Sequence, residues 1–320
     1  MNQRPELSIG IVNYNTRDLL QGCLKSIAAE PRFGEYEVIV VDNASSDGSL
    51  AMLASDFPAV HVVANEQNRG YAAAVNQFIK ICRGAVLLVL NADIAALDGA
   101  IDKTLNFLHH HEDAGFVGCR VLNPDRSLQR SCRGFPNWIN FLSENFYLYA
   151  LFPKVPLFGA VFMTHFNYQS EREVDVILGA FLMVRRRVIE QIGAMDDQFF
   201  MYAEETDWCY RAKQAGYRNL FFPGAEIIHY GEQSTRQNSV AMFIELHKSH
   251  HKYIRKYHGA AYRMLVKIIL VFGVILRLLF GTVGVALARL GFRRFAGAAE
   301  FRNRYLQTLL WYFTSATGSH

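Results

Sequence analysis

Residues 86–93 read VLLVLNAD, an uninterrupted apolar run that stops at Asn91 and Asp93. Such a run predicts a strand buried on both faces of a parallel sheet. Ligands of open parallel sheets bind beyond the carboxyl ends of the strands, which is where Asp93 falls. A carboxylate there suits Mg²⁺ or Mn²⁺ held together with substrate phosphates. The alternative is that Asp93 caps a helix beginning at Ile94.

Outward from this strand, the first two-fifths of the chain alternate strands and helices. The predicted strands are residues 8–12, 38–41, 60–64 and 86–90. Apolar residues recur at helical spacing between Leu19 and Ile27, and a second helix is predicted over residues 71–81. This alternation implies right-handed βαβ units, so the predicted class is α/β with a mostly parallel, Rossmann-like sheet.

Polar side chains follow three of these strands. They are Asn13, Tyr14 and Asn15, then Asp42 and Asn43, then Asn91 and Asp93. The chain has neither the GxGxxG dinucleotide fingerprint nor the GxxxxGK[ST] phosphate loop. Three polar strand ends in one sheet nevertheless indicate a nucleotide that lies across them.

The composition indicates which partners and which cellular compartment to expect. Hydrophobic residues make up 51% of the 320 residues and charged ones 19%, which hints at a membrane contact. The net charge is +4 without an aromatic-interleaved basic run, so no nucleic-acid partner is expected. The five cysteines form no CxxC pair, which favours a reducing compartment. The first ten residues contain no apolar signal core, so the catalytic part is expected in the cytosol.

Eight motifs occur in an order that resembles family 2 glycosyltransferases of the GT-A fold. They are IVNYN (11–15), VVDNASSDGS (40–49), NRGYAAAVNQ (68–77), LLVLNADI (87–94), LQRSCRGFP (128–136), LGAFLMVRR (178–186), FFMYAEETDWCYRAKQAG (199–216) and HYGEQS (229–234). The likeness is strongest to bacterial rhamnosyltransferases and spans about residues 7–235. It implies an inverting transfer of a sugar from a nucleoside diphosphate.

The resemblance assigns nucleotide contacts to the first strand ends. Asp42 is expected to read the base, with a helix cap as its alternative. Tyr14 is expected to stack on the base, and Asn13 or Asn15 to meet the ribose. The stretch Asn68-Arg69-Gly70 begins a helix, where free N–H groups favour a diphosphate.

The resemblance also implies a metal site. Asn91 and Asp93 match the family's metal motif, with Asn-Ala-Asp in place of Asp-x-Asp. Asn91, which lacks the first carboxylate, is assigned to the nucleotide. His229 matches a histidine that completes metal coordination in some members, and a purely structural histidine is the alternative. The expected cofactor is Mg²⁺ or Mn²⁺.

An acidic cluster begins the predicted helix near residue 204. Its catalytic candidates are Glu204, Glu205 and Asp207, and the resemblance implies that Glu205 is the general base, where the family has Asp. Acids in a first helical turn are also ordinary dipole partners. The expected sugar and acceptor contacts are Gly179, Ala180, Trp208 and Arg211. Arg211 is also spaced to pair with Asp207 at i,i+4.

The C-terminal segment changes character after residue 259. Between Lys267 and Arg289 the only charged residue is Arg277. About 20 apolar residues would span a bilayer. A basic stripe favours instead a helix that lies on an anionic membrane. This stripe consists of Arg263, Lys267, Arg277, Arg289 and Arg293. Gly281 and Gly284 are expected to split the helix into a hairpin, and a hydrophobic dimerisation surface is a further alternative.

Two other features leave alternatives open. The aromatic stretch 135–168 could be an acceptor lid, a membrane-facing wedge or the core of a subdomain. His247 and His251 have an i,i+4 spacing that could bind metal, although no third ligand lies nearby in the sequence.

The predicted organisation has three parts: a nucleotide-sugar-binding half (1–124), an acceptor-binding and catalytic half (125–258), and a basic, hydrophobic, membrane-associating helical region (259–320). The predicted function is metal-dependent transfer of a sugar, with rhamnose expected, from a dTDP- or UDP-sugar to a glycan on a polyprenyl diphosphate. We expect it to serve cell-surface polysaccharide synthesis at the cytoplasmic face of the plasma membrane, as a peripheral or monotopic protein. A non-catalytic sugar-nucleotide or glycan-binding protein is the alternative, and a homo-oligomer stays open.

Overall fold

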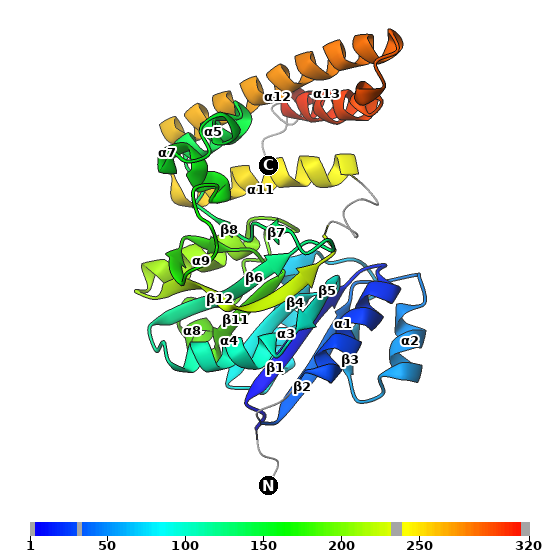
Figure 1. The fold of residues 1–320 in the computed structure, drawn as a ribbon, viewed down its shortest axis with the longest axis vertical. Coiled ribbons are helices and arrows are strands. Elements are labelled where there is room, and N and C mark those ends of the chain that lie inside the picture. The colour runs from blue at the N-terminus through cyan, green and yellow to red at the C-terminus, as the bar shows by residue number, and fades with distance from the viewer. Residues whose placement is uncertain (1–3, 31–33, 232–238, 315–320) are drawn as a thin grey trace. The chain divides into compact units, whose positions relative to one another are not determined.

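The computed structural model describes residues 4–30, 34–231 and 239–314 (Figure 1). Residues 1–135 and 166–234 form one compact unit, and residues 136–165 form a second with 235–320. These limits differ from the predicted boundaries at residues 124 and 258, because residues 136–165 of the aromatic stretch pack with the C-terminal helices. The last three residues of the HYGEQS motif lie outside the described residues.

The first unit is built on a mixed sheet. Its strand order is β3 (His61–Ala64), β2 (Tyr36–Asp42), β1 (Leu7–Asn13), β4 (Val86–Asn91), β11 (Phe181–Arg185), β6 (Ala114–Leu122), β12 (Arg218–His229) and β5 (Ile94–Leu97). Only β11 and β5 run against the common direction along this path. At its margins, β7 (Leu128–Gln129) pairs with β6 and β9 (Arg172–Val174) with β12. A separate two-stranded ladder joins β8 (Cys132–Arg133) to β10 (Val176–Ile177).

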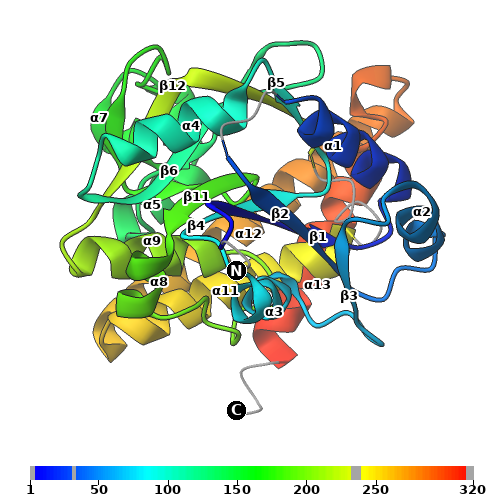
Figure 2. The same ribbon diagram turned by 90° about the horizontal axis from the view of Figure 1, so that it is seen from below.

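Helices cover both faces of the sheet (Figure 2). They are α1 (Arg17–Ala29), α2 (Ser49–Asp56), α3 (Tyr71–Ile81), α4 (Ala100–His109), α8 (Arg186–Ile192) and α9 (Glu204–Gln214). Apolar residues of α1 and α4, such as Leu20 and Leu105, join one buried core with Ile9 and Leu88 of the strands. On the other face, α3 packs closely on β1. A Cβ on Gly10 would lie 2.4 Å from the Phe78 ring, so this approach requires glycine.

The predicted βαβ pattern is confirmed. Each of the four predicted strands forms within two residues of its expected limits, and α3 coincides with the predicted helix 71–81. The alternative that Asp93 caps a helix is wrong, since residues 94–97 form β5. Ile94 pairs with His229 in the β5–β12 ladder, so the chain turns back into the sheet directly after Asp93.

The second unit is helical. It comprises α5 (Trp138–Asn145), α6 (Leu148–Leu151), α7 (Pro156–Gly159), the 3₁₀ helix η1 (Ala160–Phe162), α11 (Ser239–Tyr257), α12 (Ala260–Arg289), the 3₁₀ helix η2 (Arg293–Phe295) and α13 (Ala298–Thr314). The prediction that Gly281 and Gly284 split α12 is wrong, because the helix continues to Arg289. A Cβ on Gly281 would lie 3.0 Å from the Arg302 backbone, so this glycine lets α13 pack closely instead.

Arg277 does not belong to an exposed basic stripe, which corrects the prediction for α12. Its side chain is buried and donates to the carbonyls of Glu144 at 2.7 Å and Asn145 at 2.9 Å, at the end of α5. The guanidinium also lies over the rings of Tyr147 and Tyr305. A helix leaves its last carbonyls without partners, and here Arg277 supplies them. The aromatic stretch therefore contributes to the packing of this unit.

The paired histidines of α11 also have a packing role. His247 Nδ1 and His251 Nε2 lie 2.9 and 3.1 Å from the hydroxyl oxygen of Tyr312. Burial lowers the pKa of His251 to about 4, so the neutral form persists near neutral pH. Within the described part of the chain, no cluster of three or more His, Cys, Asp or Glu side chains could hold a metal ion.

Candidate active site

The strand register brings the polar strand ends together. Asn13 lies opposite Asp42 in the β1–β2 pair, and Val12 lies opposite Asn91 in the β1–β4 pair. These strands are parallel, so their carboxyl ends share one edge of the sheet. Asp93 follows β4 at the same edge.

Asn13 and Asp42 are fully buried and hold two loops together. The amide of Asn13 donates to Asp42 Oδ2 at 2.7 Å, and the N–H of Ser45 donates to Asp42 Oδ1 at 2.8 Å. Thr16 donates to Asn13 Oδ1 at 2.7 Å. In this structure both side chains bind the loops after β1 and β2, and direct contact with a nucleotide stays a prediction.

Tyr14 and Asn15 are partly exposed beside this pair. Asn15 has a φ of +50° and accepts from the Ser46 N–H at 2.8 Å, while its own N–H donates to Ser45 Oγ at 2.9 Å. A left-handed backbone is uncommon outside glycine, and asparagine is among the residues that tolerate it. The side chains that a ligand can reach without rearrangement at this strand end are those of Tyr14 and Asn15.

The start of α3 differs from the predicted diphosphate cradle. The N–H of Gly70 donates to Asn68 Oδ1 at 2.9 Å, and the N–H of Tyr71 donates to the Phe200 carbonyl at 2.7 Å. Two of the N–H groups expected to bind phosphate are therefore occupied within the protein, which corrects that part of the prediction. The side chain of Arg69 is exposed, so its guanidinium is accessible at this helix start.

Tyr71 is a site residue that sequence reasoning missed. Its hydroxyl donates to the Gly179 carbonyl at 3.1 Å. Burial and the negative charges of Glu204, Glu205 and Asp93 raise its pKa well above the ordinary value. The phenol therefore stays protonated beside three carboxyl groups. Its place directly after Gly70 in the NRGY motif was the available signal.

The predicted sugar wall is tied to the same group of residues. The Asn91 N–H donates to the Ala180 carbonyl at 3.3 Å, and Tyr71 holds the Gly179 carbonyl. A Cβ on Gly179 would lie 3.3 Å from the Tyr71 oxygen, so glycine gives the hydroxyl its close approach. Contact of Gly179 or Ala180 with a sugar stays a prediction.

The predicted metal ligands lie together. His229 Nε2 is 3.2 Å from Asp93 Oδ1 and 3.4 Å from Asn91 Nδ2, and its Nδ1 is 2.6 Å from Gln129 Oε1. Gln129 donates its own amide to Asn123 Oδ1 at 2.9 Å, so Oε1 faces the imidazole. From this network we infer that Nδ1 donates to Gln129 Oε1, which leaves Nε2 as the ring nitrogen that faces Asp93.

This arrangement fits a divalent cation that takes its other ligands from substrate. One carboxylate and one unprotonated imidazole nitrogen are suitable donors for Mn²⁺, and Mg²⁺ commonly combines few protein carboxylates with phosphate oxygens. Gln129, which the sequence analysis did not single out, orients the imidazole as outer ligands of metal-binding histidines do.

Glu204 and Glu205 begin α9 after a strained turn. Tyr202 and Ala203 have φ values of +68° and +64°, in the left-handed region that residues with a Cβ rarely adopt. Glu204 is 4% exposed, and its Oε2 has no hydrogen-bond partner among the described residues. Burial and the neighbouring Glu205 raise the pKa of Glu204 well above its ordinary value.

The second carboxyl of the pair has a different environment. Glu205 is partly exposed, and burial raises its pKa while the positive charge of Arg133 opposes the rise. Two close carboxylates resist ionising together, so the pair can hold one proton and one negative charge. One buried acid and one accessible base is an arrangement suited to proton transfer.

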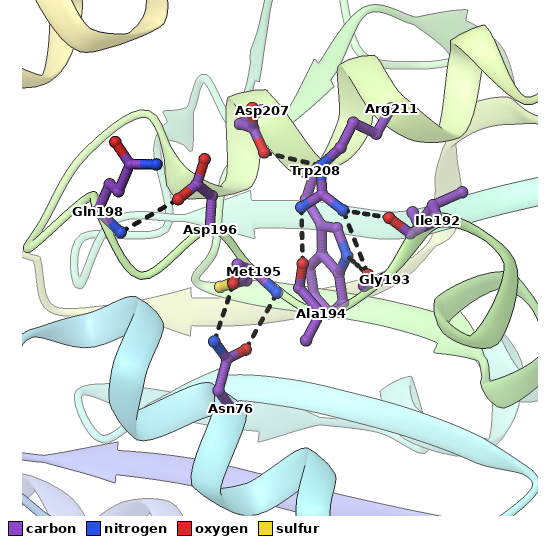
Figure 3. Close-up of polar contacts among 10 residues, drawn as sticks. All are labelled: Asn76, Ile192, Gly193, Ala194, Met195, Asp196, Gln198, Asp207, Trp208 and Arg211. Carbon is purple, nitrogen blue, oxygen red and sulfur yellow. Dashed lines mark hydrogen bonds and ion pairs between the residues drawn. The ribbon is translucent and has the colours of Figure 1, made fainter. Parts of the chain in front are cut away.

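Asp207, Trp208 and Arg211 have a different place from the predicted one. Asp207 and Trp208 are fully buried, and the indole packs on Phe116 with ring centroids 4.8 Å apart. The predicted i,i+4 ion pair forms, with Arg211 Nε 2.8 Å from Asp207 Oδ2. Together these side chains bind the loop after α8 (Figure 3). This corrects their expected roles as base or acceptor contacts.

The mixed, mostly parallel sheet with helices on both faces is a GT-A-like α/β fold. A family model described as glycosyl transferase family 2 matches residues 8–193, more than half of the chain. The chain therefore belongs to glycosyl transferase family 2 and is a glycosyltransferase.

Two proteins similar to this chain are named as rhamnosyltransferases. The chain is 28% identical over 268 residues to N-acetylglucosaminyl-diphospho-decaprenol L-rhamnosyltransferase of Mycobacterium tuberculosis, covering 80% of this chain and 86% of that protein. It is 24% identical over 233 residues to rhamnosyltransferase WbbL of Escherichia coli, covering 71% and 84%. The chain is thus rhamnosyltransferase-like, as the motifs predicted.

Solved structures support the GT-A-like fold. The mannosyltransferase PcManGT of Pyrobaculum calidifontis, in complex with GDP-Man and Mn²⁺, has a TM-score of 0.56 at 15% identity, covering 97% of this chain and 87% of that one. GalNAc-T7 with UDP, GalNAc and Mn²⁺ has a TM-score of 0.53 at 16% identity, covering 71% and 43%. At this identity the likeness concerns the fold alone.

Proposed function

We propose that the chain is an inverting, metal-dependent transferase that moves rhamnose from a nucleoside diphosphate to a lipid-linked saccharide. The observation that carries the proposal is the approach of Asp93 Oδ1 to His229 Nε2, 3.2 Å apart, at the edge where the parallel strands end. The rhamnosyltransferase relatives favour rhamnose as the sugar and a polyprenyl diphosphate as the carrier of the acceptor.

Inverting transfer requires one displacement at the anomeric carbon. The acceptor hydroxyl oxygen forms a bond to that carbon, and the bond to the diphosphate oxygen breaks with its electron pair leaving on the diphosphate. Glu205 accepts the hydroxyl proton, and the dTDP or UDP departs. Asp93 and His229 would hold the divalent cation, which supplies charge neutralisation for the leaving diphosphate.

The remaining residues act through position and charge. Arg69 is the exposed cation suited to a phosphate oxygen, and Tyr14 is the ring suited to stacking on the base. Tyr71 keeps its proton beside the carboxyl groups, so it can donate a hydrogen bond but not remove a proton. Glu205 is partly exposed whereas Glu204 is buried, so Glu205 is the better candidate for the general base.

We also propose that α12 lies on the cytoplasmic face of the plasma membrane. This helix is long and apolar enough to cross a membrane by length and composition. At 100° per residue, however, its exposed apolar residues occupy one side and its buried residues, including Arg277, the other. The exposed side comprises Met264, Leu265, Ile268, Phe272, Leu279, Phe280 and Val283. Arg263, Arg289, Arg293 and Arg294 are exposed near its ends and suit anionic headgroups.

A donor panel tests the proposed reaction. The purified 320-residue chain is incubated with dTDP-rhamnose, UDP-glucose or GDP-mannose, Mn²⁺ or Mg²⁺, and a polyprenyl-diphospho-GlcNAc acceptor. We expect acceptor-dependent release of dTDP and a product whose anomeric configuration, read by NMR, is opposite to that of the donor. Tight nucleotide-sugar binding without turnover of any donor would favour the non-catalytic alternative.

A further inference from the structure

We infer that Arg211 is a positioning residue for the carboxyl pair, because its guanidinium clamps the backbone segment that leads into Glu204 and Glu205. The inference rests on the proposed function in taking these acids as catalytic. The segment runs from Gly193, directly after α8, to Ala203, directly before α9. We call residues 193–203 the approach segment.

The guanidinium binds successive carbonyls where α8 ends. Arg211 Nη2 donates to the Ala194 carbonyl at 2.7 Å, and Nη1 donates to the carbonyls of Ile192 and Gly193. The indole Nε1 of Trp208 also donates to the Gly193 carbonyl, at 2.9 Å (Figure 3). The last carbonyls of a helix have no partner within it. Here two side chains from α9 supply those partners and thereby set the direction in which the approach segment leaves α8.

Asp207 orients the guanidinium for this task. Its side chain is fully buried, and its Oδ2 accepts from Arg211 Nε at 2.8 Å. The Nε edge of the planar guanidinium therefore faces the carboxylate, while both terminal nitrogens face the carbonyls. Lysine, with a single ammonium on a flexible stem, cannot reproduce this set of directions.

Two residues of α3 hold the approach segment further along. The side chain of Asn76 donates to the Met195 carbonyl at 2.8 Å and accepts from the Met195 N–H at 3.0 Å (Figure 3). The N–H of Tyr71 donates to the Phe200 carbonyl at 2.7 Å. The segment is thus bound at residues 193–195 and again at residue 200. Its path is determined by both α9 and α3.

This fixation explains how a disfavoured turn is maintained before the acids. Tyr202 and Ala203 are consecutive left-handed residues with side chains, and such a turn persists only where its surroundings dictate it. The turn sets the point where α9 begins, and so where the first two residues of that helix project. Arg211 binds the other end of the segment, and its hydrogen bonds within the described part of the chain go to Asp207 and to backbone carbonyls, not to either acid. Its effect on them is exerted through the backbone.

The test compares two Arg→Lys variants. Arg211→Lys should lower kcat by about 10²-fold, the order expected for a misplacement of about 1 Å, with KM for the nucleotide sugar nearly unchanged. Arg186→Lys is the matched control. Arg186 also donates to two backbone carbonyls, those of Gly84 at 2.8 Å and Cys82 at 2.9 Å, but at the opposite end of β4. The control should retain the kcat of the wild type.

A second variant and a second readout separate positioning from folding. Trp208→Phe removes one hydrogen bond to Gly193 and keeps a buried ring, so it should lower kcat in the same direction by a smaller factor. Amide hydrogen exchange should increase within residues 193–203 in Arg211→Lys, with the exchange of β4 unchanged. Wild-type kcat in both variants would overturn the inference alone. A wild-type enzyme that turns over no donor would overturn the proposed function and this inference with it.

Discussion

The Nε2 atom of His229 lies 3.2 Å from Oδ1 of Asp93, although one residue ends β12 and the other follows β4. The β5–β12 pairing produces this approach, since Ile94 lies opposite His229. We expect Asp93→Ala to abolish release of the nucleoside diphosphate, because one of the two proposed metal ligands is lost. EDTA should have the same effect on the wild type, and added Mn²⁺ should reverse it. Full turnover in EDTA would exclude metal dependence.

Gln129 should control metal affinity without touching the metal. Its Oε1 lies 2.6 Å from His229 Nδ1. Loss of such an outer partner typically weakens metal binding about 10–100-fold. We therefore expect Gln129→Met to raise the Kd for Mn²⁺, measured by calorimetry in the presence of nucleoside diphosphate, by that factor. An unchanged Kd would mean that the imidazole is oriented by other contacts.

Glu205→Gln should lower kcat by about 10²–10⁴-fold, the usual contribution of a general base. Donor binding should hardly change because the amide keeps the shape of the side chain. Burial raises the pKa of Glu205, so the base form increases with pH, and kcat of the wild type should rise with pH through that pKa. The variant should lack this rise. If Glu204→Gln suffers the larger loss, the base is Glu204.

Glu204 should make stability depend on pH. Its folded-state pKa is raised from 4.5, mainly by burial, so the folded state binds more protons than the unfolded state above about pH 4.5. The free energy of unfolding should therefore fall as pH rises from 4.5 through the folded-state pKa. Glu204→Gln should flatten this dependence and raise the Tm at neutral pH. Thermal unfolding between pH 4.5 and 8 measures both effects, and parallel curves for the two proteins would contradict the prediction.

The exposed face of α12 should determine membrane binding. Phe272 and Phe280 are 60% and 54% exposed, and an Asp at each should release the 320-residue chain from anionic liposomes in a flotation assay. Leu50→Asp, at a 39% exposed position on α2, is the control and should float with the wild type. Resistance of the wild type to alkaline extraction would show a spanning helix instead.

The amino-acid sequence was sufficient to predict the α/β class and the family. Short sequence patterns carry this information. The apolar run in VLLVLNAD is typical of a strand buried on both faces, and apolar residues at helical spacing predicted α1 and α3. Polar residues at strand ends predicted the edge where Asn13, Asp42 and Asn91 gather, because parallel strands end on one side of a sheet. Motif order then indicated the glycosyltransferase family.

Local sequence patterns could not separate polar side chains that are accessible to a ligand from those that bind backbone groups of the protein. This distinction depends on tertiary contacts. Asp207 and Arg211 have the same charges in either role. They lie beside the end of α8, the preceding helix. There Asp207 pairs with Arg211, and Arg211 binds the approach segment. Tyr71 and Gln129 join the site through contacts with Gly179 and His229 that no local pattern encodes. Arg277, expected at a membrane surface, is buried because α5 ends in carbonyls that need donors, and long-range packing alone brings the two together.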